Sequence, residues 1–390
     1  MTSGKHICFV LTTPFALNAF VAPIIRVLIS SGWRVTVAVN CGSHAVAEEV
    51  ARCVEVLDVK IVRHIAPVQD ISALWALNKI FRDRRFDIVH SITPKAGLLA
   101  MLASKLACTP IRVHTFTGQV WVTQRGLMRW LLHSLDWVLA QCATALLVDS
   151  PSQFEFLVGE KIVNSERLTV LGSGSIAGID LTKFTPNPLS RETIRRQQGI
   201  SSNALVLLYV GRMHPEKGVV ELVQAFQLLS KSHPETHLIL VGPDEGAVEQ
   251  ALSINETSQS RIHVIGHTAQ PENYMAAADI YCLASYREGF GLSLIEAAAS
   301  GLPCVASHIY GVTDAVVDGV TGLLVGPRDV RALAAALLKL ADQPVLRQQM
   351  GANGRKRVEK DFSQNAVVAA WMAFYQLQLQ ALQSRNTDTE

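Results

Sequence analysis

The sequence has little that would mark a membrane-spanning or disulfide-bonded protein. No apolar run approaches the roughly 18 residues that cross a bilayer, and Asn18, Pro23 and Arg26 interrupt the first long apolar stretch. The N-terminus also lacks a secretory signal, since "ICFVLTT" is only as long as a strand. The seven cysteines show no Cys-x-x-Cys pair and no metal-binding spacing, which favours a reducing compartment. We therefore expect a cytoplasmic protein that is not integral to a membrane.

An excess of charge of one sign is missing as well. The chain carries 35 Lys and Arg against 33 Asp and Glu, which argues against a dedicated nucleic-acid-binding protein. The first 185 residues nevertheless hold 18 basic and 13 acidic side chains. A basic amino-terminal half would suit an anionic bilayer or acceptor, although random scatter of a few charges explains the same count.

What the sequence does contain is an alternation of short β-branched runs with helical stretches. This pattern predicts an α/β fold with parallel sheets covered on both faces. The expected strands are 6–12, 34–39, 61–64, 87–92, 111–115, 144–149 and 168–171 in the first half, and 204–210, 237–241, 261–265, 280–284, 303–306 and 322–325 in the second.

A break in the alternation divides the chain. "FTPNPLS" at 184–190, with two prolines and an asparagine, predicts a linker between an amino-terminal domain, 1–183, and a carboxyl-terminal domain, 191–363. A long helix and a polar tail are expected at 364–390. Two doubly wound halves imply a ligand-binding cleft where the carboxyl ends of their strands meet.

Two cations follow the first strand of the second half, in "GRMHPEKG". Arg212 and Lys217 fall in the loop after this strand, where an open α/β sheet binds ligands, and they would neutralise a diphosphate. Each close ion pair is worth up to about 4 kcal/mol at an effective dielectric constant of 20, before desolvation is subtracted. The alternative is that both side chains are simply solvated.

Two glutamates flank a glycine turn in "EGFGLSLIE". The turn, 289–291, precedes a helix expected to begin near Leu292, and the unpaired amides of such a helix start favour phosphate oxygens. Glu288 and Glu296 would repel a phosphate, so we expect them to accept hydrogen bonds from uncharged hydroxyls. A sugar nucleotide offers both kinds of group. The alternative is one solvated glutamate and one exposed helix glutamate.

These motifs, followed by "GLPCVAS" and "DAVVDGVTGLLV", resemble the donor half of a retaining GT-B glycosyltransferase of family 4 over most of residues 203–342. The resemblance implies two Rossmann-like domains facing across a cleft, with the C-terminal helix crossing back. It implies a nucleotide-sugar donor, first of all a UDP-sugar, and neither a cofactor nor a metal. The sequence agrees, because it has no Asp-x-Asp pair. Retention would follow from front-face attack, with the leaving phosphate helping to deprotonate the acceptor.

The resemblance also assigns roles to the residues of both motifs. The catalytic residues would be Glu288, which holds the transferred sugar, and Arg212 and Lys217, which bind the diphosphate. The rest of the donor site would comprise Glu296 on the ribose, Phe290, the amides of Gly291 and Leu292 on the diphosphate, and His267 beside the nucleobase.

The amino-terminal half resembles the family less closely. The loop "TTPFALNAF" after the first strand lacks the glycines of many members, and Asn18 within it either lies on the acceptor side or caps the following helix. "HTFTGQVW" puts Thr117 where many members have a histidine that touches the transferred sugar. Thr117, Gly118 and His114 are therefore acceptor-side candidates, although a strand histidine is more often a core residue.

"WVTQRGLMRWLLHSLDW" predicts an apolar helix with a narrow polar stripe. If this helix lies at a membrane interface, Trp121, Arg125, Arg129 and Trp130 would face the lipid headgroups. The same stripe also fits a helix that is buried on most sides.

The sequence thus predicts a bacterial glycosyltransferase of O-antigen, lipopolysaccharide or capsule biosynthesis. It would transfer a hexose or N-acetylhexosamine to a polyprenyl-diphosphate-linked or oligosaccharide acceptor, as a peripheral protein at the inner face of the inner membrane. Two alternatives stay open. A GT-B-fold epimerase or hydrolase would act on the nucleotide sugar itself, and a non-catalytic subunit would bind the nucleotide sugar without turnover.

Overall fold

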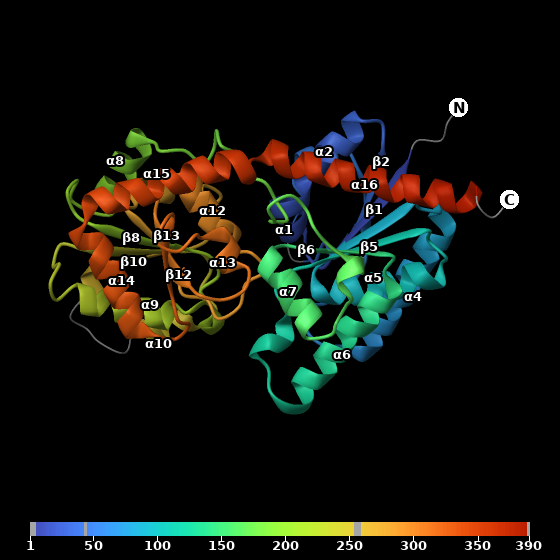
Figure 1. Ribbon diagram of the computed structural model, residues 1–390, viewed down its shortest axis with the longest axis horizontal. Coiled ribbons are helices and arrows are strands. Elements are labelled where there is room, and N and C mark those ends of the chain that lie inside the picture. Colours follow the sequence, from blue (N-terminus) through green and yellow to red (C-terminus); the bar gives the residue numbers. More distant parts are fainter. Residues whose placement is uncertain (1–4, 43–44, 253–258, 388–390) are drawn as a thin grey trace. The chain divides into compact units, whose positions relative to one another are not determined.

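The computed structural model describes residues 5–42, 45–252 and 259–387, which form two compact α/β units (Figure 1). Unit 1 comprises Met1–Gly178 and Gln364–Glu390, and unit 2 comprises Ile179–Ser363. Each unit is built on one parallel sheet covered by helices. The predicted α/β class with two doubly wound halves is confirmed.

Unit 1 contains a seven-stranded sheet in the order β3-β2-β1-β4-β5-β6-β7. β1 and β4 are buried at every position, as expected of parallel strands covered on both faces. The strands are β1 (His6–Leu11), β2 (Arg34–Val39), β3 (Glu55–Asp58), β4 (Ile88–Ile92), β5 (Ile111–Phe116), β6 (Ala145–Val148) and β7 (Leu168–Val170).

The helices of unit 1 form two layers. α4, α5, α6 and α7 cover one face of the sheet and α2 and α16 the other, as right-handed crossovers require (Figure 1). The helices are α1 (Pro14–Ala16), η1 (Leu17–Val21), α2 (Ala22–Ser30), α3 (Glu48–Ala51), α4 (Pro67–Arg84), α5 (Pro94–Leu106), η2 (Val120–Thr123), α6 (Gly126–Cys142), α7 (Pro151–Gly159), η3 (Ser165–Arg167) and α16 (Gln364–Thr387).

The third strand differs from the prediction. The chain pairs with β2 through β3, Glu55–Asp58, and not through residues 61–64. The amide of Ile61 donates to the carbonyl of Val59 at 2.7 Å, a tight turn that takes the chain out of the extended conformation before 61–64. Ile61 is buried, so its apolar side chain packs in the core although the residue is not part of the sheet.

Unit 2 contains a six-stranded sheet in the order β10-β9-β8-β11-β12-β13. The strands are β8 (Val206–Val210), β9 (His237–Val241), β10 (Ile262–Ile265), β11 (Ile280–Leu283), β12 (Cys304–Ser307) and β13 (Gly322–Val325). The helices are α8 (Pro188–Gln197), η4 (Pro215–Lys217), α9 (Val219–Leu229), α10 (Ala247–Leu252), η5 (Gln259–Arg261), α11 (Pro271–Ala277), α12 (Leu292–Ala299), α13 (Val312–Ala315), α14 (Val330–Asp342) and α15 (Pro344–Asp361).

The segment 184–190, which we predicted as a linker, lies within unit 2. Phe184 packs in the core of unit 2, and α8 begins at Pro188. Asn187 caps α8, its side chain accepting from the Ser190 amide at 3.1 Å. The two compact units divide at Gly178 instead.

The C-terminal helix α16 returns to unit 1, as predicted, and packs beside α2. Its Tyr375 hydroxyl lies 2.7 Å from Nδ1 of His90 in β4, and Nε2 of His90 lies 2.8 Å from Oγ1 of Thr115 in β5. The ring of Trp371 stacks on His90 with centroids 5.0 Å apart. A buried polar cluster thus fixes α16 to the sheet.

Candidate active site

The strand order of unit 2 reverses between β8 and β11, so the loops after these two strands flank the topological switch point of the sheet. Open α/β sheets bind ligands at such a point, outside the carboxyl ends of the strands. Residues 211–218 follow β8, and residues 284–291 follow β11. These two loops carry most of the predicted donor-site residues.

Backbone contacts hold the two loops together. Gly218 has a φ of +67°, and a Cβ placed on it would lie 2.0 Å from the carbonyl oxygen of Ala284. The amide of Tyr286 donates to the carbonyl of Glu216 at 2.9 Å, and the Tyr286 hydroxyl donates to Glu221. The spacing between the loops is therefore fixed before any ligand arrives.

Lys217 and Glu288 meet across this contact. The Lys217 Nζ donates to Oε1 of Glu288 at 2.7 Å, and the hydroxyl of Ser285 donates to the same oxygen at 2.8 Å. Both charged side chains are largely shielded from solvent, with exposed fractions of 22% and 14%. The solvated-loop alternative for Lys217 is therefore wrong.

Arg212 lies in the same loop and pairs with Glu245 at 2.5 Å. Its backbone is held by Tyr209, whose hydroxyl donates to the Arg212 carbonyl at 2.7 Å. Burial raises the pKa of Tyr209, so this hydroxyl stays a donor. The Arg212 side chain is less shielded than that of Lys217 and has further N–H groups for an anionic ligand.

The glycine turn opens α12 as the sequence predicts. Gly291 has a φ of +87° and precedes Leu292, the first residue of the eight-residue helix. The turn is buttressed by Gly311, because a Cβ there would lie 2.2 Å from the carbonyl oxygen of Gly289. The Phe290 side chain is buried and packs edge-on against Phe362, with ring centroids 5.2 Å apart. Phe290 can therefore contact a donor only through its backbone, and its place in the donor site stays a prediction.

Glu296 lies in the second turn of α12 and is partly buried. Burial raises the pKa of its carboxyl from 4.5 to about 7, with Lys183 lowering the pKa and Glu272 raising it further. Lys183 and Glu272 form an ion pair at 3.5 Å. A carboxylate with this pKa is half charged near neutral pH and gains from hydroxyl donors when charged. The exposed-glutamate alternative is wrong.

His267 lies in the loop after β10, the edge strand of the sheet, and is exposed. Its position beside the other carboxyl-edge loops is compatible with backbone contacts to a nucleobase. Its role stays a prediction.

The acceptor-side candidates of unit 1 separate in the structure. Thr117 follows β5, and its carbonyl accepts from the side chains of Gln119 at 2.7 Å and Gln153 at 2.8 Å. Thr117 and Gly118 are partly buried at the carboxyl edge. His114 is 1% exposed, lies 2.9 Å from the hydroxyl of Ser91, and burial lowers its pKa to about 3. His114 is a neutral core residue, which corrects its assignment to the acceptor side.

Asn18 lies inside the π-helix η1 and does not cap a helix. Its side-chain Nδ2 donates to the carbonyl of Ala45 at 3.2 Å, and its Oδ1 accepts from the backbone amide of Ala47 at 2.9 Å. The side chain thus ties the loop after β2 to the segment after β1. The contact of Asn18 with an acceptor stays a prediction.

Sequence reasoning missed two threonines at the switch point of unit 1, which lies between β1 and β4. Thr12 and Thr93 follow these strands, and their hydroxyl oxygens lie 2.8 Å apart. Thr93 has a φ of +77°, a strained conformation for a β-branched residue that costs about 1–3 kcal/mol. The signal available in the sequence was position alone: each threonine is the first residue after its strand.

The helix predicted to face a membrane is α6, and the structure corrects part of its assignment. Trp121 is 1% exposed, and its Nε1 donates to Oδ2 of Asp136 at 2.7 Å. Arg129 stacks over Trp121 and pairs with Glu160 at 3.1 Å. Trp121 therefore belongs to the core, where the partly buried carboxylate of Asp136 accepts from its N–H. Arg125 and Trp130 are exposed, as the interfacial hypothesis requires.

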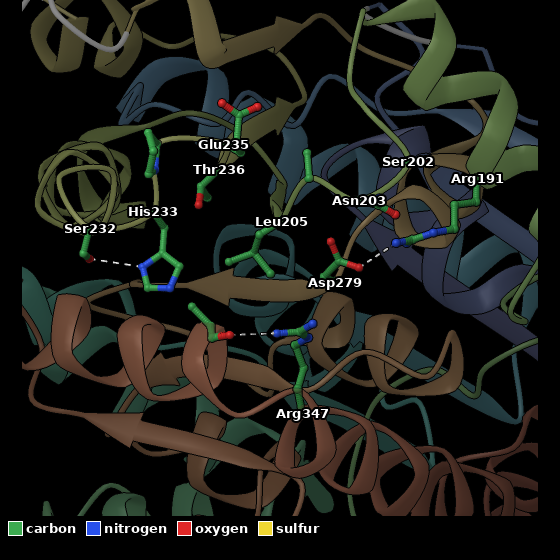
Figure 2. Close-up of a pocket in the computed structure, with 13 residues that line it drawn as sticks. Arg191, Ser202, Asn203, Leu205, Ser232, His233, Glu235, Thr236, Asp279 and Arg347 are labelled. Atoms are coloured by element: carbon green, nitrogen blue, oxygen red, sulfur yellow. Dashed lines mark hydrogen bonds and ion pairs between the residues drawn. The ribbon is translucent and has the colours of Figure 1, made fainter.

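A cavity of about 430 Å³ lies at the opposite edge of the unit 2 sheet (Figure 2). Its lining includes Leu205, Thr236 and Asp279, which precede β8, β9 and β11 at their amino ends. Arg191 in this lining pairs with Asp279 at 2.7 Å. The predicted donor residues lie at the carboxyl edge, so this cavity is not part of that site.

Two searches across the described residues bear on metals and membranes. Within 5–42, 45–252 and 259–387, no three His, Cys, Asp or Glu side chains cluster in a way that could hold a metal ion. In the same ranges no helix combines the length and the apolarity that spanning a bilayer demands.

Two family models match the chain. The model described as "Glycosyl transferases group 1" matches residues 190–357, and the model described as "Glycosyl transferase 4-like domain" matches residues 16–174. The first match contains all of the predicted donor-site residues.

Relatives in sequence span most of the chain. A capsular polysaccharide biosynthesis glycosyltransferase from Staphylococcus aureus is 30% identical over 307 residues, covering 78% of this chain and 80% of the relative. A UDP-Gal:alpha-D-GlcNAc-diphosphoundecaprenol alpha-1,3-galactosyltransferase from Escherichia coli is 27% identical over 310 residues, 78% of each chain.

Solved structures share the fold. Sucrose-phosphate synthase from Thermosynechococcus elongatus superimposes with a TM-score of 0.81, at 22% identity, covering 97% of this chain and all of the other. This likeness concerns the fold alone.

Proposed function

The chain belongs to family 4 of the GT-B glycosyltransferases, and on that premise we propose that it transfers a hexose or N-acetylhexosamine from a UDP-sugar to a lipid-linked glycan, with retention and without a metal. The observation that carries this proposal is the shielded ion pair of Lys217 and Glu288 at the switch point of unit 2, beside the glycine turn that opens α12.

This arrangement suits a ligand with a diphosphate next to neutral hydroxyls. Lys217 has three N–H groups, so its ammonium keeps its bond to Glu288 while donating to a phosphate oxygen. Arg212 and the outward amides of Gly291 and Leu292 supply further donors for the diphosphate. Glu288, already neutralised by Lys217, accepts from sugar hydroxyls without repelling the phosphate at full strength.

The same groups promote departure of the nucleoside diphosphate. When the bond between the anomeric carbon and the phosphate oxygen breaks, negative charge grows on the diphosphate, and fixed donors stabilise that charge without reorganising. Arg212 and Lys217 thereby take the role that a divalent cation would otherwise fill. The acceptor hydroxyl attacks from the face that the phosphate leaves, and the phosphate oxygen receives the hydroxyl proton.

Glu296 binds the ribose hydroxyls in this proposal, and His267 lies beside the base. The choice of uridine and of a polyprenyl-diphosphate acceptor is supported by the similarity to the Escherichia coli galactosyltransferase. A place in capsule or surface-polysaccharide synthesis is supported by the Staphylococcus aureus relative. We propose that the enzyme works at the inner face of the bacterial inner membrane, where such acceptors lie.

Incubation of the protein with a panel of radiolabelled UDP-sugars, with and without a polyprenyl-diphosphate glycan, tests this function. We expect label in the lipid product only with acceptor, equal rates with and without EDTA, and the same anomeric configuration in donor and product. The Lys217→Ala variant is the control for contaminating activity. Release of free sugar without acceptor would indicate a hydrolase instead, an epimerised nucleotide sugar an epimerase, and binding without turnover a non-catalytic subunit.

A further inference from the structure

The outer faces of α4 and α6 carry apolar side chains that no part of the chain covers within the described residues. We propose that these faces form a docking surface for an anionic phospholipid membrane, which we name the α4–α6 surface. It comprises Val68, Ile71 and Trp75 on α4, and Leu127, Trp130, Leu131 and Trp137 on α6. The proposal rests on the proposed function, because it names the surface that brings the enzyme to a lipid-linked acceptor.

The apolar residues of α6 recur at helical spacing on its outer side. Leu127, Trp130 and Trp137 are 79%, 65% and 49% exposed, whereas Leu139, two residues beyond Trp137 and on the other side of the helix, is fully buried. A soluble helix normally turns its polar side to water, so this exposure of large apolar side chains needs a partner.

α4 repeats the arrangement. Val68, Ile71 and Trp75 are 82%, 58% and 61% exposed, while Ala73 and Leu77 on the opposite side of the helix are buried. The stripe continues toward the end of α4 with the exposed side chain of Lys79. The outer face of α4 is therefore apolar in its first half and charged beyond it, where Lys79 and Arg82 accompany the exposed Asp83.

The two faces belong to one layer of unit 1. α5 packs between α4 and α6, and all three helices cover the same face of the sheet (Figure 1). Helices in such a layer run opposite to the strands, so the first turns of α4 and α6 lie at the carboxyl edge of the sheet. Val68 and Leu127 are in these first turns, at the edge that carries Thr93 and Thr117. A membrane on this surface would place lipid headgroups near the predicted acceptor side.

The charges on these helices select an anionic partner. The carboxylates of α4 and α6 are Asp70, Asp83 and Asp136, of which only Asp83 is exposed. Asp70 pairs with Lys95 at 2.6 Å, and Asp136 is held by Trp121. The exposed cations of the two helices and of the residue before α6, which include Lys79, Arg82 and Arg125, outnumber the exposed Asp83.

Exposed tryptophans interspersed with basic residues are the composition of a helix that lies in a lipid interface, where the indole sits at the headgroup level and the cations meet anionic lipids. For a protein partner we would expect the α4–α6 surface to carry both carboxylates and cations that could pair with charges of the partner. The membrane is therefore the occupant that the chemistry of both helices favours.

Flotation of the purified full chain with vesicles tests the surface. We expect it to float with vesicles rich in phosphatidylglycerol and much less with pure phosphatidylcholine. Replacing four outward residues, as Ile71→Ser, Trp75→Ser, Trp130→Ser and Leu131→Ser together, should lower vesicle partitioning by at least about tenfold. The control is Leu189→Ser with Val345→Ser, which removes two apolar side chains of unit 2 that are 77% and 76% exposed. It should float like wild type.

Three further measurements keep this test separate from the glycosyltransferase proposal. UDP-sugar binding and turnover on a short-chain soluble acceptor should be unchanged in the fourfold variant, while turnover on a long-chain acceptor in vesicles falls. Equal flotation of the variant and wild type would overturn the surface, as would a wild-type dimer in solution that the variant converts to monomer. Failure of wild type to transfer any sugar, with flotation intact, would instead refute the proposed function.

Discussion

Lys217 Nζ lies 2.7 Å from Glu288 Oε1, although the two residues stand 71 positions apart and follow different strands. The strands, β8 and β11, are neighbours at the point where the sheet order reverses. The ion pair is thus a product of topology, and it places a cation and a carboxylate at the usual ligand position of an open α/β sheet.

Removal of the cation should abolish most activity. In Lys217→Ala, the leaving diphosphate loses one fixed charge-assisted donor, and Glu288 is left partly buried without its cation. We expect kcat to fall by more than about 100-fold, which corresponds to about 3 kcal/mol of transition-state stabilisation. Initial rates at saturating donor measure the effect, and an unchanged kcat would refute the assignment.

A double-mutant cycle tests whether Lys217 and Glu288 act together. Each single substitution to Ala disrupts the same pair. The loss of transition-state stabilisation in the double variant Lys217→Ala/Glu288→Ala should therefore be smaller than the sum of the losses in the two single variants, by a coupling energy of about 1 kcal/mol or more. Arg212→Ala combined with Lys217→Ala serves as the comparison, since Arg212 pairs with Glu245 instead. Full additivity for Lys217 and Glu288 would show that the contact has no role in turnover.

The glycine turn offers a test of loop position. In Gly311→Ala the new Cβ would lie 2.2 Å from the carbonyl oxygen of Gly289, so the turn before α12 must move and its amides lose their alignment. We expect donor affinity and kcat to fall together by about tenfold or more, because a shift of about 1 Å in a binding group has large effects.

Gly319→Ala is the matched control for that variant. Gly319 has a φ of +72°, close to the +80° of Gly311, and a Cβ there meets open space. Gly319→Ala should lose about 1 kcal/mol of folding stability from its positive φ alone, and Gly311→Ala should lose more because its Cβ also meets backbone, as measured by urea denaturation. Only Gly311→Ala should lose activity. Equal kinetic loss in both would mean that backbone strain alone explains the effect.

The fold and the donor loops could be predicted because both depend on patterns within short stretches of the sequence. The alternation of strands and helices predicted both sheets except for β3, and the glycine turn at 289–291 precedes a helix where the sequence predicted one. The pairing of Lys217 with Glu288 could not be read from the chain, since it depends on which strands are neighbours. Thr93 escaped notice for the same reason, and its strained backbone has no sequence signature.

Burial was the other source of error. The sequence analysis named His114 as a candidate of the acceptor side and Trp121 as a candidate of a membrane-facing helix, and the structure puts both side chains in the core. An aromatic or histidine side chain serves a core and a binding surface equally well, so sequence composition cannot separate the two. Trp130 shows the opposite case, since the same helix exposes it.

Trp121 should therefore matter for stability and not for membrane binding. In Trp121→Phe, Asp136 loses the donor at 2.7 Å and remains partly buried, at a cost of about 1–3 kcal/mol of unfolding free energy. Trp130→Phe, at an exposed position, should change that free energy by less than about 0.5 kcal/mol. Urea denaturation of both variants measures the contrast. An unchanged free energy of unfolding in Trp121→Phe would contradict this role in the core.

Glu296 couples folding stability to pH in a direction opposite to that of a salt-bridged carboxylate. Burial raises the pKa of Glu296 from 4.5 to about 7, so the folded chain keeps a proton that the unfolded chain releases above pH 4.5. The free energy of unfolding therefore falls as pH rises from about 5 to 7, by up to about 3 kcal/mol, because the buried carboxyl must release its proton.

The Glu296→Gln variant should remove this loss, because an amide carries no charge to bury. We expect the variant to become more stable than wild type by a margin that grows between pH 5 and pH 8, and UDP-sugar affinity to rise with pH in wild type only. Thermal unfolding with and without UDP-sugar at several pH values measures both quantities. If the stability of wild type and of Glu296→Gln changed with pH in parallel between pH 5 and pH 8, Glu296 would be ionised over this whole range. Its proposed contact with the ribose would then not depend on a carboxyl whose pKa is raised by burial.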